Sequence, residues 1–117
     1  MNETDLTLAE RVLLQRRRAG QSQREAAKAH GVTLYRFRRW ETGEEEPAKV
    51  SLGDLRSHEV CFLRRRRAGI SVQDLARELD VTPWWLTQME YGRQGCVRLL
   101  DYWGAKERPW RPRKAVT

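Results

Sequence analysis

The stretch Thr33-Leu34-Tyr35-Arg36-Phe37-Arg38-Arg39-Trp40-Glu41 decides the fold that we predict for this chain of 117 residues. Thr33 is a favoured N-cap and Gly43 can end a helix, so the pattern predicts a helix over 34–41. At 3.6 residues per turn, Phe37 and Trp40 share one face, and the arginines spread around the other. Such a helix can pack on a small core and present cations to a DNA groove. A solvated surface helix would carry the same charges, so the neighbouring segments must decide.

Two further helices precede this stretch. Thr7 and Glu10 have the spacing of a capping box and predict a helix over 8–19. Ser22 predicts the cap of a helix over 23–30, and Gly31 supplies a tight turn. Three short helices with these connections predict a helix-turn-helix unit.

The unit occurs twice. A shift of 49 residues places the run 16–20 on 65–69, Ser22 on Ser71 and Glu41 on Glu90 without a gap. We therefore predict an all-α fold of two tandem helix-turn-helix bundles with four to five short helices each. The expected domains are 1–56 and 57–104, followed by a basic, flexible tail at 105–117.

Further helices are expected around and within the second copy. Ser57 predicts the cap of a helix over 58–68, and later helices fit 72–79, 83–91 and about 96–103. Between the copies, Ser51 with Asp54 predicts a short helix that carries Leu52 and Leu55.

Composition limits the function. The 23 Lys and Arg against 16 Asp and Glu give a net charge of +7, as expected for a partner of polyanions or simply for a basic protein. No apolar run approaches the roughly 18 residues of a membrane span and no signal peptide is visible, so a cytoplasmic protein without membrane contact is expected. Cys61 and Cys96 lack metal-ligand spacing, and His30 and His58 are isolated. We expect no enzyme activity, metal, cofactor or small-molecule ligand.

The combined pattern resembles the Xre family, the lambda-type Cro and repressor helix-turn-helix domains. The matching residues in the first copy are Gly20-Gln21-Ser22-Gln23, Glu25-Ala26-Ala27, Gly31-Val32-Thr33 and the run from Trp40 to Pro47. Those in the second copy are Gly69-Ile70-Ser71, Asp74-Leu75-Ala76, Val81-Thr82 and Glu90-Tyr91-Gly92. The resemblance covers about 10–50 and 59–103. It implies a sequence-specific regulator of transcription that binds double-stranded DNA, such as a promoter-occupying (auto)repressor of a phage or mobile-element operon.

The resemblance also implies roles for single residues. Structural ion pairs are expected between Arg16 and Glu41 and between Arg65 and Glu90. Because Gln15 stands where the family prefers an aliphatic residue, Arg17 is an alternative partner for Glu41. Base edges would be contacted by Leu34, Tyr35, Arg36 and Arg39, and the DNA backbone by Gln23, Lys28, Thr33 and Arg38.

Two other features depart from the family pattern. Carboxylates are repelled by phosphates, so the loop Glu44-Glu45-Glu46 is expected to point away from DNA. His30 occupies a usually apolar position, where it would be a core histidine or a cation at the helix end.

The second copy differs chemically from the first, and two alternatives stay open. Either Trp84, Thr87 and Gln88 form a second DNA subsite, or Trp84 and Trp85 form a dimer contact. A homodimer would place two copies of helix 34–41 on a palindromic operator, about 34 Å apart.

The basic tail and the protein class each leave an alternative as well. The tail residues Arg108, Arg111, Arg113 and Lys114 would contact phosphates or only aid solubility. The rival class is an antitoxin or antiactivator, which would use the second copy to mask a protein partner.

Overall fold

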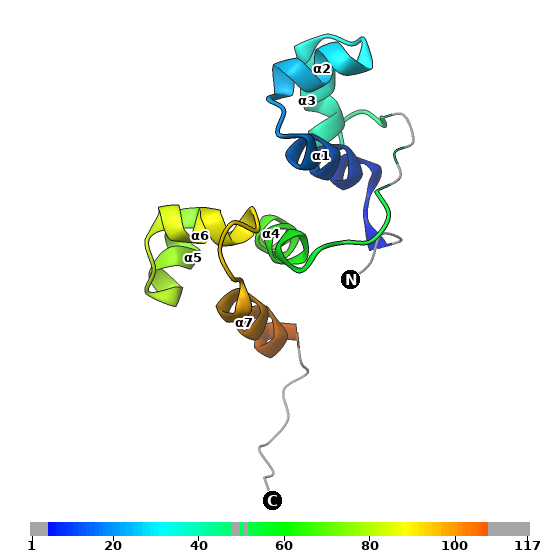
Figure 1. The fold of residues 1–117 in the computed structure, drawn as a ribbon. Coiled ribbons are helices and arrows are strands. Elements are labelled where there is room, and N and C mark those ends of the chain that lie inside the picture. Colours follow the sequence, from blue (N-terminus) through cyan, green and yellow to red (C-terminus); the bar gives the residue numbers. More distant parts are fainter. Residues whose placement is uncertain (1–4, 48–49, 51, 108–117) are drawn as a thin grey trace, which may run out of the picture. The chain divides into compact units, whose positions relative to one another are not determined.

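The computed structural model describes residues 5–47, 50 and 52–107, and within these ranges the chain consists of helices and loops without strands (Figure 1). The helices are α1 (Leu8–Ala19), α2 (Gln23–His30), α3 (Leu34–Thr42), α4 (Ser57–Ala68), α5 (Val72–Leu79), α6 (Pro83–Glu90) and α7 (Val97–Glu107). They fall into two compact units, residues 1–55 and 56–117. The predicted all-α class is confirmed, and the helix-turn-helix arrangement stays a prediction.

Side-chain caps fix where the first helices begin. The Thr7 hydroxyl accepts the Glu10 backbone N–H at 3.1 Å, and the Glu10 carboxylate accepts the Thr7 N–H at 3.0 Å. Ser22 and Glu25 make the same reciprocal pair, at 3.1 and 2.9 Å. These bonds satisfy N–H groups that have no partner inside the helix, so the predicted bounds 8–19 and 23–30 are confirmed.

The core of the first unit lies where its helices meet. Phe37 is fully buried, and it clusters with Val12 from α1 and with Ala26 and Ala27 from α2. Two alanines at this contact let the α2 and α3 backbones approach closely. The periodicity of α3 thus determines which of its faces turns outward.

The second unit repeats this plan with different apolar side chains. Leu75, Leu86 and Met89 are buried at the positions of Ala26, Phe37 and Trp40. A further helix, α7, packs against α4 and adds Leu99 and Trp103 to the core.

The short helix that we predicted between the two units is not present in the described residues. Residues 52–55 form no helix, and Ser51 lies outside the described residues. Instead, Arg18 donates to the backbone carbonyls of Leu52 and Asp54, at 2.6 and 2.8 Å. These bonds and the burial of Val50 hold the segment on its own unit without helical hydrogen bonds. Among the described residues the first unit therefore has three helices and the second has four, where four to five were expected in each.

Several helix boundaries also differ from the prediction: α3 ends at Thr42 and α6 ends at Glu90, each one residue from the expected end. Ser57 is the first residue of α4 and not its cap; Arg56 precedes the helix, and its backbone N–H bonds the Glu59 carboxylate at 2.9 Å. Helix α7 continues to Glu107, so residues 105–107 are helical and do not belong to a flexible tail. The tail cations Arg108, Arg111, Arg113 and Lys114 lie outside the described residues. Across the part of the chain that the structure describes, each helix is too short or too polar to cross a bilayer.

Candidate nucleic-acid interface

Helix α3 presents two chemically different faces. Phe37, Trp40 and Glu41 are buried, whereas Tyr35 is 71% exposed. Arg36 and Arg38 are also exposed, and Leu34 and Arg39 are half-buried. The residues predicted to contact base edges therefore all lie on one short, rigidly anchored helix.

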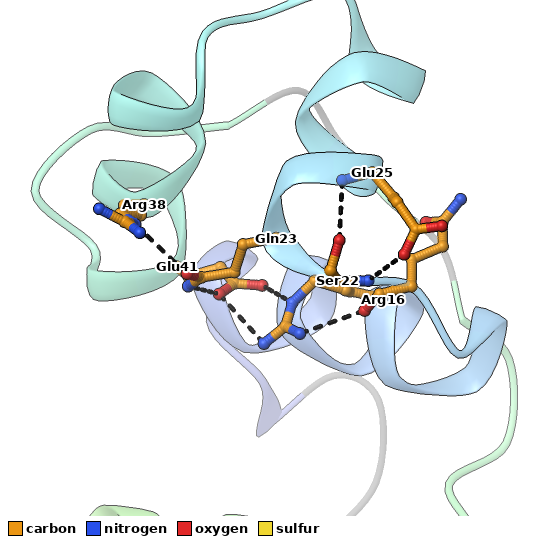
Figure 2. A network of polar contacts seen from close by, with 7 residues as sticks. Arg16, Ser22, Gln23, Glu25, Arg38 and Glu41 are labelled. Carbon is orange, nitrogen blue, oxygen red and sulfur yellow. Dashed lines mark hydrogen bonds and ion pairs between the residues drawn. The ribbon is translucent and has the colours of Figure 1, made fainter.

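A polar network ties the buried side of α3 to both other helices of the unit (Figure 2). Arg16 on α1 donates from Nε to Glu41 Oε2 at 2.6 Å, and Gln23 on α2 donates from Nε2 to Glu41 Oε1 at 2.8 Å. Arg38 then donates to Gln23 Oε1 at 3.3 Å. Gln23 and Arg38, two predicted contacts to the DNA backbone, are thus linked to the ion pair between Arg16 and the buried Glu41.

The ion pair recurs in the second unit, 49 residues later. Arg65 Nε lies 2.8 Å from Glu90 Oε2, and Arg65 also donates to the Ile70 carbonyl, as Arg16 does to that of Gln21. Both carboxylates are almost fully buried, which makes these pairs part of each core. Valine and threonine stand at the positions of Gln23 and Arg38, so the relay to the surface is confined to the first unit.

The acidic loop after α3 lies close to the arginines of that helix. Glu45 Oε1 lies 2.6 Å from Arg36 Nε, and Glu44 Oε2 lies 3.7 Å from Arg39 Nε. The loop therefore turns back toward the two arginines predicted to read bases. The Arg36 hydrogen bond holds the pKa of the Glu45 carboxyl below its usual value. Our expectation rested on the repulsion between these glutamates and phosphates, and left out their attraction to the arginines of the preceding helix.

The structure also shows where the remaining residues singled out in the first unit lie. Lys28 is exposed on α2, and the Thr33 hydroxyl is used in capping, since it accepts the Arg36 backbone N–H at 3.1 Å. His30 packs on the core aromatics, with ring centroids 5.8 Å from Phe37 and 5.5 Å from Trp40. His30 is half-buried and is also the last residue of α2, so its position agrees with both alternatives.

Helix α6 exposes aromatic rings where α3 exposes arginines. Trp84 is 62% exposed and Trp85 is 40% exposed, with ring centroids 6.1 Å apart. Thr87 donates its hydroxyl to the Pro83 carbonyl at 3.0 Å, and Gln88 is half-buried. The surface of α6 is thus mainly apolar, with few donors for base edges.

Charge is also divided unequally between the two units. The first contains ten Lys and Arg against nine Asp and Glu, and the second contains thirteen against seven. The unit with the arginine helix is therefore almost neutral, because the three glutamates after α3 offset its cations.

Two further features of the described ranges concern metal ligands and cysteine reactivity. No three His, Cys, Asp or Glu side chains there are grouped as metal ligands would be. Burial raises the pKa of the Cys61 thiol to about 12, which is unfavourable for a nucleophile.

Comparison of the chain with known protein families, with curated proteins and with solved structures found no match in any of the three. The function has to be inferred from the residues themselves, and the exposed face of α3 is their most distinctive arrangement.

Proposed function

We propose that this chain is a regulator of transcription that binds double-stranded DNA and uses α3 as the helix inserted into the major groove. The observation that carries the proposal is the orientation of α3: Phe37 and Trp40 anchor it, and Tyr35, Arg36 and Arg39 lie on its outer side. The helix has the width that a major groove admits, and arginine is the side chain best suited to guanine O6 and N7. The likeness to Xre repressors favours the same function, with promoter occupancy as its mode of action.

Affinity and specificity would come from different parts of the chain. The second half of the sequence has the larger excess of cations, so it would supply most of the attraction to phosphates, including that from the tail. The arginines of α3 would distinguish bases, each contributing about 1–3 kcal/mol, or roughly 5- to 150-fold. Backbone contacts would position the helix without reading sequence.

Footprinting on DNA upstream of the protein's own gene tests this proposal. Arg36→Ala and Arg39→Ala should each lower the preference for the protected site over random duplex, with only a modest loss of general affinity. Arg66→Ala is the matched control, since it removes the same charge from an exposed position of α4. An equal drop for all sequences would assign the arginines to the DNA backbone, and no protected site for the wild-type protein would refute the proposal.

The exposed pair Trp84 and Trp85 supports a second copy of this chain as the partner of α6. The two rings offer adjacent apolar area at the position where α3 has its DNA-directed side chains. A homodimer would place two α3 helices on a palindromic operator, about one helical turn apart. Trp84→Ala/Trp85→Ala should then be a monomer by mass in solution and should bind the operator more weakly.

The same experiment separates the alternatives. An unchanged dimer would remove α6 from the interface. A wild-type monomer that binds no DNA would favour the antitoxin or antiactivator class, in which the tryptophans contact a different protein.

A further inference from the structure

The acidic loop that follows α3 braces both arginines of the proposed DNA surface. Glu45 donates its backbone N–H to the Arg39 carbonyl at 3.2 Å, which holds the loop against the last turn of the helix. From there Glu45 pairs with Arg36 at 2.6 Å, and Glu44 lies 3.7 Å from Arg39. An aromatic ring also lies near each guanidinium: the Trp40 ring centroid is 6.0 Å from that of Arg36, and the Tyr35 ring centroid is 5.7 Å from that of Arg39.

This geometry determines which donors of Arg36 remain unoccupied. A guanidinium has five N–H donors in a planar fork, and the carboxylate of Glu45 occupies the one at Nε. The two terminal nitrogens remain available, and they can bond guanine O6 and N7 together. The ion pair with Glu45 restricts the Arg36 side chain before binding, which reduces the side-chain entropy that is lost on binding.

The carboxylates also affect phosphate and base contacts differently. Charges within a Debye length of about 8–10 Å are felt at moderate salt, so a phosphate close to Arg36 would also be repelled by Glu45. A guanine edge carries no net charge and is repelled far less. The acidic loop therefore weakens contacts that depend on charge alone and preserves contacts that depend on hydrogen-bond geometry.

The second unit provides an internal comparison. At the positions of Arg36 and Arg39 it has Trp85 and Gln88, and at those of Glu44 and Glu45 it has Arg93 and Gln94. Both members of each pair are replaced together, as expected if the carboxylates act on the arginines.

We propose that Glu45, assisted by Glu44, is a specificity-determining residue: it positions Arg36 for a base edge and lowers the affinity of α3 for phosphates alone. This inference rests on the proposed function and adds to it an acidic component of the DNA-reading surface. The predicted consequence is a protein that discriminates between sequences better than its arginines would alone.

The decisive experiment compares Glu45→Gln with Glu46→Gln. Both changes remove one negative charge from the same loop, and the structure gives an ion pair with an arginine of α3 only for the first. Affinities would be measured for the footprinted operator and for a random duplex of equal length, at several salt concentrations. Glu45→Gln should bind the random duplex about two- to fivefold more tightly, the range of one exposed ion pair, and its operator preference should fall by a similar factor. Glu46→Gln should change that preference by less than about twofold.

Nuclear magnetic resonance of the free protein provides a readout that needs no DNA. The Glu45 carboxyl should titrate below its usual pKa, and in Arg36→Ala that pKa should rise. An unaltered titration in Arg36→Ala would show that the brace is absent and would overturn this inference.

The binding data separate the two proposals. A clear operator whose preference is the same in wild type, Glu45→Gln and Glu46→Gln would overturn the role of Glu45 and leave the proposed function intact. A wild-type protein that prefers no sequence, with the brace present in the titration, would overturn the proposed function and with it the role in specificity.

Discussion

Arg16→Met should destabilise the first unit by about 3 kcal/mol, because it leaves the buried Glu41 carboxylate without its guanidinium. Glu41 is 4% exposed and accepts two hydrogen bonds from Arg16, at 2.6 and 3.4 Å. Methionine keeps the apolar stem of the side chain, so the lost packing is small and the change mainly tests the charge.

The magnitude follows from the surroundings of the pair. Removing one partner of a buried ion pair costs about 3–5 kcal/mol. The Arg16 side chain is 20% exposed, so water screens this pair, and Gln23 still donates to Glu41 at 2.8 Å. Both facts favour the lower end of that range. One small core supplies only about 3–5 kcal/mol, so the first unit of this variant should retain at most about 2 kcal/mol of stability.

Amide hydrogen exchange over residues 8–42 measures the first unit separately from the second. Arg24→Met is the control, because Arg24 is exposed on α2, and it should cost less than about 1 kcal/mol as a surface change. The double variant Arg16→Met/Glu41→Leu should regain much of the lost stability, since apolar residues can replace a buried pair. A loss below about 1 kcal/mol for Arg16→Met, or a double variant as unstable as the single one, would refute the reasoning.

Two predictions concern the second unit. A pKa of about 12 keeps the Cys61 thiol protonated at pH 8, so iodoacetamide should modify it at least about 100-fold more slowly than half-buried Cys96. Peptide mass spectrometry measures both rates, and equal rates would contradict the burial of Cys61. Gly92→Ala should cost at least about 1 kcal/mol more than Gly43→Ala in thermal unfolding. Both glycines have positive φ, but only at Gly92 would the new methyl lie 2.7 Å from the His58 ring, and equal losses would contradict this.

Much of the fold follows from local chemistry in the sequence. Caps such as Thr7 and Ser22 act on their own helix, so the bounds of α1 and α2 could be derived from a few neighbouring residues. The shift of 49 residues then carried the same logic to the second unit. The correspondence between the units extends to the turn after the second helix of each. Asp80 adopts φ +57° where the first unit has Gly31, and aspartate tolerates this conformation better than most residues.

The errors arose where distant groups compete with local preference. Ser51 and Asp54 have the spacing of a helix cap, but Arg18 takes the carbonyls of Leu52 and Asp54 from 34 and 36 residues away. Likewise, the pairing of Glu45 with Arg36 depends on a loop that folds back at Gly43, which no spacing rule predicts. Roles in DNA binding came from resemblance and stay predictions.

The segment after Pro47 has a practical consequence for dissecting the chain. The acidic, proline-containing loop has the composition of a linker and would be a natural place to end a gene fragment. Such a fragment would lack Val50, which is buried in the core, and the Leu52 and Asp54 carbonyls, to which Arg18 donates. A first unit expressed alone should therefore extend to residue 55, and one cut at residue 47 should be prone to aggregation because it exposes apolar surface.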